Sequence, residues 1–315
     1  MGRRPRPKGP VRDAVLVVDK PAGPTSHDVV AAVRRVIGHS RVGHTGTLDP
    51  AATGVLVLGL GRATKLVRFL QAGTKTYAAR IHLGVETDTQ DAEGVVLATT
   101  DASHLDERTV CEVLTRFQGE FEQVPPMVSA LKVDGERLHA KARRGEEVER
   151  AARRVRVDSL VLDAFTAGEV TEVSVLLTCS AGTYVRTIAH DVGAVLGVGG
   201  SLASLRRIAN GPFVVDEAHT LDEVVGAGQE GVPALSLDVV SAIERVLEVE
   251  HVTDEDLARR VTQGRSAPAL GRDRPVALIR PASAERPPQL LAIVADDGAG
   301  RSRPELVWTR PEELA

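Results

Sequence analysis

The sequence predicts an α+β protein in which strands and helices follow one another without a repeated unit. β-rich apolar runs alternate with segments of helical periodicity, and Gly, Pro and Asp-Gly turn signals separate them. At 315 residues the chain is long enough for about two domains, and its 43% hydrophobic share supplies a core. Because only 3% of residues are aromatic, that core must consist almost entirely of Val, Leu, Ala and Ile.

The first part of the chain predicts strand, helix and loop in turn. Pro21 ends the first β-rich run, Gly38 ends the first helical pattern, and a loop rich in Gly and Thr follows. In order, we expect a strand at 14–21, a helix at 27–38, a loop at 43–54, an apolar run at 55–60, a helix at 63–73, a strand at 76–83 and an acidic loop at 86–94.

The middle of the chain continues this alternation. An Asp-Gly pair predicts a turn between a strand and a basic helix, and Tyr184, Ile188 and Val192 recur every four residues, as in a helix. The elements are a helix at 105–117, a turn at 134–135, β-rich stretches at 154–165 and 169–180, and a helix at 182–197 that the glycines at 199–200 end.

The last third changes pattern after a Gly- and Pro-containing break at 226–233. An acidic helical region comes first, and then β-rich runs at 246–252, 276–279 and 290–295 surround one short helix at 253–264. We therefore expect a basic, flexible N-terminus at 1–13, a main domain at 14–245 and a small β-rich domain at 246–315.

Charge is distributed unevenly behind a formal total of −4. Residues 1–50 carry nine Lys/Arg and four Asp/Glu, residues 132–156 carry nine and five, and residues 216–256 carry one and twelve. Such a chain could present a basic face to a polyanion while its acidic part points away. Solvated helix faces would give the same counts, so charge alone leaves both interpretations open.

Composition also excludes several protein classes. No uninterrupted apolar run approaches the roughly 18–20 residues that cross a bilayer, and the run after the basic N-terminus is too short for a signal peptide. We therefore expect a soluble, cytoplasmic protein. Cys111 and Cys179 lack the spacing of a disulfide framework or a zinc site, so both should be reduced, buried residues.

The strongest local signal is GHTGTLDPAATGVL at 43–56. Its glycines and Pro50 restrict the backbone, so this loop can hold the Asp49 carboxylate rigidly near His44. An Asp before Pro more commonly caps a turn, whereas loops positioned by strands often carry catalytic groups. Both roles remain open for Asp49.

No companion motif for a standard chemistry accompanies this loop. The chain has no G-x-x-x-x-G-K-[ST], G-x-G-x-x-G, G-x-S-x-G or H-E-x-x-H motif, and its nine His residues lack metal-ligand spacing. If the protein is an enzyme, we expect a single carboxylate to act without a metal or another cofactor.

Tyr77 and Tyr184 are the only two tyrosines, and each follows a Thr near a basic residue. Both could stack on nucleic-acid bases, or they could fill core space with the hydroxyl bound to a partner. Arg186, at the start of a helix, could bind a phosphate, pair with Asp49 or form an ordinary buried ion pair.

Six segments occur in order between residues 14 and 213: VDKPAGPTSHD, GHTGTLDPAATGVLVLGLGRATKL, KTYAARIHLGVETDTQDAEG, PPMVSALKVDGERL, CSAGTYVRTIAHDVG and SLRRIANGPF. Together they resemble the bacterial TruB family of tRNA pseudouridine-55 synthases. The resemblance implies the pseudouridine-synthase fold, with a mixed, mainly antiparallel central sheet, flanking helices and a central cleft. The tail from about residue 246 is similar to a PUA-type RNA-binding domain.

The resemblance also implies roles for single residues. Asp49 matches the catalytic aspartate, and His44 the residue that helps to hold the target nucleotide out of the RNA loop. Tyr77 matches the aromatic residue that stacks on the target base, and Tyr184 and Leu205 match residues that line the uridine pocket. Arg186 matches the arginine that pairs with the catalytic carboxylate. Lys20 and Lys132 lie in matched motifs, with RNA-binding or structural roles. His139 and Lys141 stand where the family often has aromatic residues.

The implied reaction converts a uridine in the T loop of tRNA to pseudouridine, after the base is flipped, without a metal or cofactor. We expect a monomer that binds the T arm and no membrane. Asp49 would attack the sugar or remove a proton from it, and an arginine beside it would lower its pKa. A non-catalytic tRNA-binding or folding-assistance protein is the alternative. A guide-RNA-dependent relative is less favoured, because no extension for partner proteins is evident.

Overall fold

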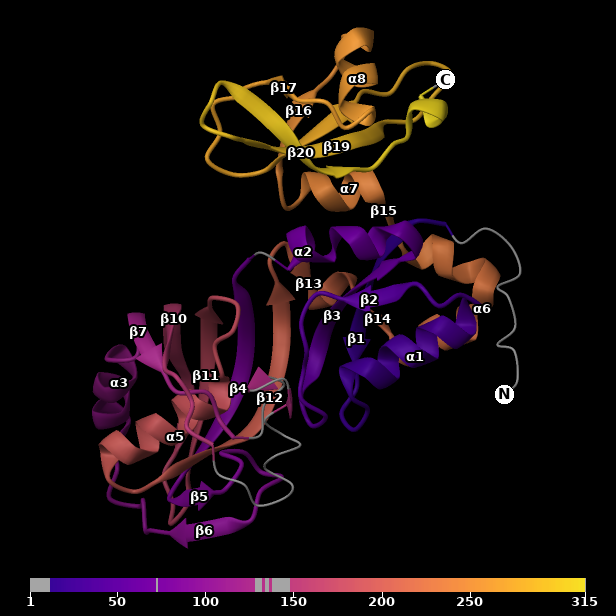
Figure 1. Cartoon of the computed structure of the whole chain (residues 1–315). Coiled ribbons are helices and arrows are strands. Elements are labelled where there is room, and N and C mark those ends of the chain that lie inside the picture. The colour runs from indigo at the N-terminus through magenta and orange to yellow at the C-terminus, as the bar shows by residue number, and fades with distance from the viewer. Residues whose placement is uncertain (1–11, 72, 128–131, 134–135, 138–147, 315) are drawn as a thin grey trace.

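The computed structural model describes residues 12–71, 73–127, 132–133, 136–137 and 148–314. A large mixed sheet runs through the main body, and a small β-rich domain stands above it in Figure 1. In the part of the chain that is described, no helix is long and apolar enough to span a membrane.

Within the described residues the central sheet has 11 strands, eight of them in the order β14-β1-β3-β12-β4-β11-β10-β7, while β2 pairs with β3, β13 with β12 and β15 with β1. The pairs are antiparallel except β1 with β14 and β3 with β12. The strands are β1 (Ala14–Lys20), β2 (Val42–His44), β3 (Thr53–Leu60), β4 (Lys75–Leu83), β7 (Gly119–Gln123), β10 (Arg153–Thr166), β11 (Thr171–Cys179), β12 (Gly200–Asn210), β13 (Phe213–Val214), β14 (His219–Thr220) and β15 (Leu237–Asp238).

Helices pack against both halves of this sheet (Figure 1). Two of them, α1 and α6, cover β1 and β3, whereas α3 and α5 cover β4, β10 and β11. The helices are α1 (Ser26–Val36), α2 (Val67–Leu70), α3 (Glu107–Thr115), α5 (Val185–Leu196), α6 (Leu221–Gly231), α7 (Val239–Glu244) and α8 (Glu255–Thr262), with 3₁₀ turns η1 (Gly61–Leu66), η2 (Val215–Glu217), η3 (Val232–Leu235) and η4 (Pro311–Glu313). Two small hairpins pair β5 (Val85–Thr87) with β6 (Val96–Thr99) and β8 (Lys132–Val133) with β9 (Glu136–Arg137).

The ends of the helices follow local sequence signals. Thr25 and Asp28 form a reciprocal capping box at α1, in which each backbone N–H donates to the other side chain. Gly197 ends α5 with a φ of +77°, a left-handed conformation that favours glycine. Both helices therefore begin and end close to where their sequence patterns predict.

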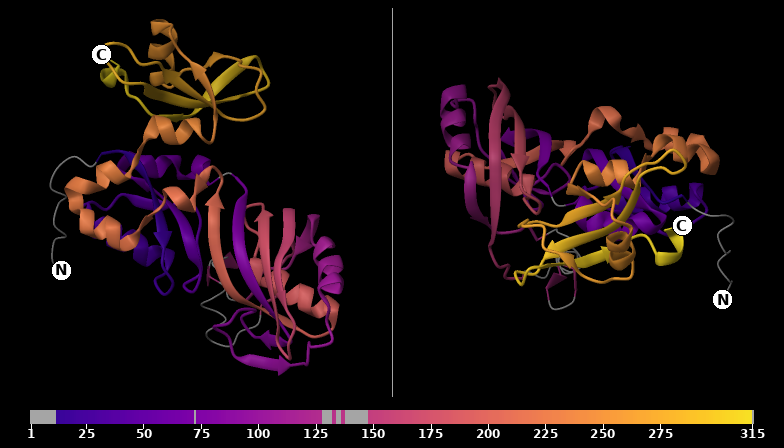
Figure 2. Two further views of the ribbon diagram at one scale, coloured as in Figure 1. Left: turned by 180° about the vertical axis from the view of Figure 1, so that it is seen from behind. Right: turned by 90° about the horizontal axis from the view of Figure 1, so that it is seen from above.

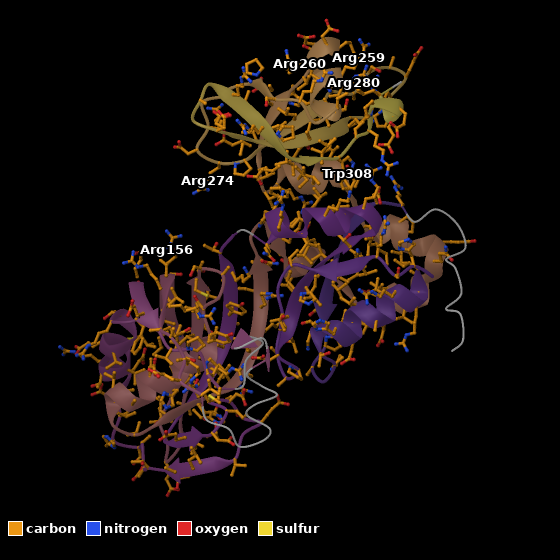
Figure 3. All side chains as sticks on the ribbon, viewed as in Figure 1. Arg156, Arg259, Arg260, Arg274, Arg280 and Trp308 are labelled. Carbon is orange, nitrogen blue, oxygen red and sulfur yellow. The ribbon has the colours of Figure 1, made fainter. Side chains whose placement is uncertain are left out.

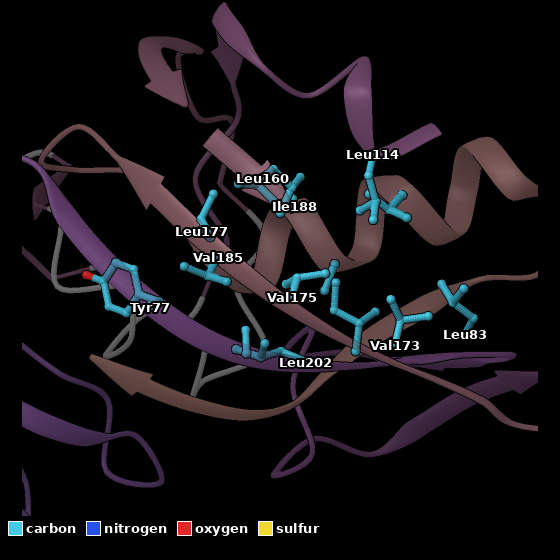
Figure 4. Close-up of a cluster of buried hydrophobic side chains, with 14 of the residues drawn as sticks. Tyr77, Leu83, Leu114, Leu160, Val173, Val175, Leu177, Val185, Ile188 and Leu202 are labelled. Carbon is cyan, nitrogen blue, oxygen red and sulfur yellow. The ribbon is translucent and has the colours of Figure 1, made fainter. Parts of the chain in front are cut away.

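The aliphatic core lies mainly between the sheet and its helices. Leu160, Val175 and Ile188 belong to one buried cluster between α5 and the strands β10 and β11 (Figure 4). Tyr77 lies at one end of this cluster, and its hydroxyl oxygen points away from the aliphatic side chains. The core therefore ends at a polar boundary, at the start of β4.

The small domain is built on a five-stranded sheet in the order β16-β18-β19-β20-β17, against which α8 packs. Only β16 and β18 run parallel. The strands are β16 (Glu248–His251), β17 (Ala267–Pro268), β18 (Val276–Arg280), β19 (Gln289–Asp296) and β20 (Arg301–Val307).

The two domains share one hydrophobic cluster. Ile279 of β18 is buried together with Val15 of β1 and Val240 of α7, and Figure 2 shows α7 between the two domains. Figure 3 shows Trp308 at the same junction. The Arg62 guanidinium reaches it from the main body and lies 4.8 Å from the centre of the Trp308 ring. The small domain is therefore packed on the body rather than tethered by a linker.

The structure corrects several predicted elements. Residues 200–210 form the central strand β12, which the sequence did not reveal because two arginines interrupt its apolar alternation. The predicted break at 226–233 begins inside α6, where Gly228 has a φ of +63° and kinks the helix instead of ending it. The predicted helix at 63–73 consists of the 3₁₀ turn η1 and the single turn α2.

Two further predictions concern the chain after β7 and the cysteines. The turn predicted at 134–135 and most of the basic helix predicted after it, at 138–147, lie outside the described residues, while the described strand β9 pairs antiparallel with β8. Both cysteines are free, but only Cys179 is fully buried, since Cys111 of α3 is partly exposed.

Candidate active site

A cavity of about 480 Å³ opens between the loop that joins β2 to β3 and the first turn of α5. Residues of α2, β4 and β12 complete its walls. Five of the eight site residues predicted from the sequence line it: Asp49, Tyr77, Tyr184, Arg186 and Leu205. Segments up to about 150 residues apart in the chain therefore meet at one hollow, as an active site requires.

Arg186 joins two carboxylates at this cavity. Its Nη2 lies 3.0 Å from Asp49 Oδ2, and its Nη1 lies 3.1 Å from Asp91 Oδ2. Only 4% of the Arg186 surface is exposed. The Asp49–Arg186 pair that the resemblance implied is thus present, and the guanidinium is fixed from both sides.

Asp91 is a site residue that sequence reasoning missed. Its Oδ1 accepts hydrogen bonds from Thr89 Oγ1 at 2.6 Å and from the Glu93 backbone N–H at 3.1 Å, which leaves Oδ2 for Arg186. The one signal in the sequence was the acidic loop at 86–94, but nothing in its spacing distinguishes Asp91 from its acidic neighbours.

The net effect on the pKa of Asp49 is opposite to the expectation. Burial in the cavity wall raises this pKa above its ordinary value, Arg186 and Lys20 lower it, and Asp91 raises it. The arginine acts in the expected direction, but desolvation outweighs it. The Asp49 side chain is 44% exposed, and the exposed part faces the cavity that it lines.

Lys20 supports the loop of Asp49 from inside the protein. The residue has no exposed surface, and its Nζ donates to the carbonyls of Pro21, Pro50 and Ala52 at 2.7–3.0 Å. Burial lowers the pKa of Lys20 to about 8. In the structure Lys20 therefore exposes no surface to a substrate, and its contacts are those of a structural residue.

Other buried polar groups hold the same loop. Ser26 Oγ both donates to the Leu48 carbonyl and accepts from the Leu48 N–H. On the opposite flank, Arg207 of β12 donates through Nη2 to the Gly46 carbonyl at 3.2 Å and through Nε to the Val55 carbonyl at 2.7 Å. The loop is thus rigid because three separate segments bind its backbone.

Gly54 allows β3 to approach β12 closely, and we expect Gly54→Ala to destabilise the fold. Gly54 has a φ of +101°, and an added Cβ would lie 2.1 Å from the Arg207 carbonyl oxygen. Strain and overpacking together should lower the free energy of unfolding by about 2–5 kcal/mol, measured by chemical denaturation. Gly211→Ala is the control, because Gly211 has a φ of +57° but no atom within 4 Å of the new Cβ. Equal losses in the two variants would contradict the steric explanation.

The two tyrosines occupy different parts of the cavity wall. Tyr77 is almost fully buried, and this burial raises the pKa of its hydroxyl. Tyr184 is half-buried at the N-cap of α5, where Gln123 binds its backbone N–H and carbonyl and the Arg153 guanidinium lies 4.9 Å from its ring centre. Each ring therefore serves the packing and also faces the cavity.

Besides Lys20, two further predicted residues do not line the cavity as far as the structure describes it. His44 is half-buried, and its Nδ1 accepts from the Gly46 N–H at 3.2 Å while its ring packs edge-on against His27. Burial and His27 lower the pKa of His44. Lys132 belongs to β8, but its side chain lies outside the described residues, as do His139 and Lys141. In the described part of the chain, no three His, Cys, Asp or Glu side chains could hold a metal ion.

Similarity to known proteins decides the family. Residues 34–185 match the N-terminal domain of the TruB family pseudouridylate synthases, and residues 186–248 match the tRNA pseudouridylate synthase B C-terminal domain. The tRNA pseudouridine synthase B of Rhodococcus jostii is 46% identical, with all of both chains covered. That of Thermobifida fusca is 44% identical over 94% of this chain and 98% of the relative. The chain belongs to the TruB family.

Solved structures agree with this membership. The Cbf5-Nop10-Gar1 complex contains a chain with a TM-score of 0.72 and 25% identity, over 96% of this chain and 86% of that one. The archaeal box H/ACA Nop10-Cbf5 complex gives 0.70 and 23%, over 97% and 89%. The pseudouridine-synthase fold predicted for this TruB-family chain is confirmed, and the chain is a pseudouridine synthase, which is an isomerase.

Proposed function

We propose that this TruB-family enzyme isomerises uridine-55 in the T loop of tRNA to pseudouridine, with Asp49 as its catalytic residue. Pseudouridine formation in tRNA follows from relatives that carry the name tRNA pseudouridine synthase B at 42–46% identity. The single observation that carries the assignment of Asp49 is its ion pair with the buried Arg186 inside the cavity.

The reaction breaks the N1–C1′ bond of uridine, rotates the base and forms a C5–C1′ bond, after which the C5 proton leaves and N1 gains a proton. No redox agent and no net water is consumed. Asp49 either attacks the sugar or removes a proton from it, and both routes need the ionised carboxylate. Arg186 supports this state, because its positive charge favours the carboxylate form of Asp49.

The base must leave the RNA stack to reach Asp49, and the cavity suits an everted nucleotide. Tyr77 and Tyr184 offer ring surfaces for stacking on the uracil, and Leu205 supplies an apolar wall. We propose that His44, at the entrance of the loop, helps to keep the nucleotide everted, and that Lys132 lies near the RNA.

The non-catalytic alternative is less favoured. A protein that only binds tRNA has no need of a carboxylate that a buried guanidinium holds at a cavity wall. The chains matched in the Cbf5-Nop10-Gar1 and box H/ACA Nop10-Cbf5 complexes are only 23–25% identical, against 46% for a relative named tRNA pseudouridine synthase B.

The remaining assignments follow from the same proposal. Residues 14–245 would form the catalytic unit and 246–315 a PUA-like RNA-binding unit, and 1–13 a basic arm. We also propose a monomer as the active form. Because tRNA is its substrate, the enzyme would act in the cytoplasm.

Mapping pseudouridine in unmodified tRNA after incubation with the purified full chain tests this proposal. We expect one modified position, uridine-55, and no modification of a tRNA that carries cytidine there. Pseudouridine at another position alone would overturn the T-loop assignment. No pseudouridine in any tRNA would overturn the substrate class.

A further inference from the structure

Among the described residues, four cationic side chains line the cavity, and only two of them have a carboxylate partner. Arg186 has two such partners, and Arg68 Nη2 lies 3.5 Å from Glu305 Oε2. Lys75 and Arg207 form no ion pair within the described part of the chain. Two positive charges of the cavity wall are therefore uncompensated.

These two charges lie side by side against the loop that carries Asp49. A Cβ built on Gly46 would lie 3.7 Å from Lys75 Cε and 3.9 Å from Arg207 Nη1, so both side chains approach one point of the backbone. Lys75 is 7% exposed and Arg207 is 1% exposed. Bulk water therefore does little to solvate either charge.

Neutral backbone groups do not replace an anion here. Lys75 Nζ lies 3.4 Å from the Gln71 carbonyl and 3.3 Å from the Gly73 carbonyl, well beyond the length of about 2.8 Å at which a charged N–H donor binds strongly. Arg207 donates to the backbone carbonyls of Val55 and Gly46 and also interacts with the Tyr77 hydroxyl, and none of these partners is an anion. Burial and the neighbouring guanidinium both lower the pKa of Lys75, as expected for a cation without a partner.

We propose that the Lys75 ammonium binds a backbone phosphate of the nucleotide that enters the cavity, with Arg207 as a fixed positive charge behind it. The proposal rests on the proposed function, because the anion is supplied by the RNA substrate. A buried cation without a counterion is costly, so a ligand that brings the anion is favoured.

The position of Lys75 relative to Asp49 suits a single nucleotide that contacts both residues. Gly46, which both cations approach, precedes Asp49 by three residues, a span of at most about 10 Å. In the proposed complex, the phosphate next to the reacting sugar would lie against Lys75 when C1′ meets the Asp49 carboxylate. Lys75 would fix the sugar–phosphate backbone, and Arg207 would act as a positioning residue through the loop carbonyls.

A double-mutant cycle between protein and RNA tests this contact. Binding of a synthetic T stem-loop RNA is measured in the Asp49→Asn background, with and without Lys75→Met. The RNA carries either normal phosphates or one uncharged methylphosphonate, on the 5′ or the 3′ side of the target uridine. We expect Lys75→Met to weaken binding of the normal RNA about tenfold and to reduce the slope of log K against log[salt] by about 0.7.

The deciding measurement is the coupling between the Lys75→Met substitution in the protein and the methylphosphonate in the RNA. At one of the two positions, the methylphosphonate should weaken RNA binding by the protein that keeps Lys75 about tenfold. The same methylphosphonate should weaken binding by the Lys75→Met protein less than about twofold. Lys75→Arg, which keeps the charge, should retain most of the coupling. Additive losses at both positions would overturn the proposal.

Two controls separate the possible failures. Arg108→Met removes one positive charge from the exposed face of α3 and should show no coupling to either methylphosphonate. If Lys75→Met does not fold, Lys75→Gln repeats the cycle with a neutral donor. Additive losses in the binding cycle, together with pseudouridine formation by the wild-type chain, would reject only the phosphate contact. Absence of pseudouridine in unmodified tRNA with the wild-type chain would reject the proposed function itself.

Discussion

An Asp49→Asn variant should lose turnover by at least about 10³-fold while its affinity for tRNA changes little. Asparagine has nearly the same shape as aspartate, but it neither attacks the sugar nor accepts a proton at pH 7. A loss of this size is expected when an essential nucleophile or general base is removed. Release of tritium from tRNA labelled at C5 of uridine measures the turnover, and filter binding measures the affinity.

The same variant also tests the site as a whole. Arg186 keeps its ion pair with Asp91 in this variant, so no buried charge is left without a partner and the thermal unfolding temperature should stay near that of the wild type. Asp19→Asn is the matched control, because Asp19 also pairs with an arginine, Arg206, but does not line the cavity. Tritium release from Asp49→Asn at the wild-type rate would show that another group performs the chemistry.

An Arg186→Met variant should lose about 10²–10³-fold in kcat and shift the pH dependence of activity. Without the guanidinium, the Asp49 and Asp91 carboxylates face each other with no cation between them. Removing one partner from a buried charge cluster typically costs about 3–5 kcal/mol, so reduced stability should accompany the loss of activity. Single-turnover assays and thermal unfolding measure the two effects separately.

The direction of the pH shift follows from the causes that act on Asp49. Burial already raises its pKa, and Arg186 is the main group that lowers it. The reaction needs the carboxylate, so activity of the wild type should fall as the pH drops through this raised pKa. Loss of Arg186 raises the pKa further, and the acid limb of the pH–rate profile should move to higher pH.

Arg186→Lys separates charge from geometry. Lysine keeps the positive charge but lacks the fork that contacts both carboxylates, so its profile should lie between those of the wild type and Arg186→Met. Arg206→Met is the matched control, because it breaks the arginine–aspartate pair with Asp19 at 2.7 Å without removing a cavity residue. An unshifted acid limb in Arg186→Met would contradict the electrostatic role of Arg186.

Much of the site could be predicted because its residues belong to short, specific motifs. Asp49 and Arg186 are 137 positions apart, yet the structure brings them to 3.0 Å, as the family resemblance implied. The sequence could not reveal Asp91 or Arg207, because each acts through a contact between segments that no local pattern encodes. The direction of the Asp49 pKa also depends on burial, which spacing alone does not report.

The limits of the fold prediction have similar physical causes. Strand β12 lies at the centre of the sheet, but Arg206 and Arg207 hide its pattern, since one pairs at the sheet surface and the other turns inward to the loop of Asp49. Lys20 illustrates the same difficulty. A lysine normally indicates a solvated surface, and only its three carbonyl partners explain why it is buried.

The apolar cluster at the junction of the domains limits how far the small domain can move when the enzyme binds a large, L-shaped substrate. Since Ile279, Val15 and Val240 exclude water from one common interior, swinging the small domain outward would wet their side chains at a cost of about 25 cal/mol for each Å² exposed. The distance between the cavity and the surface formed by β18–β20 is thus held constant by this packing. If the small domain binds RNA, as we propose, docking should leave the angle between the two domains unchanged.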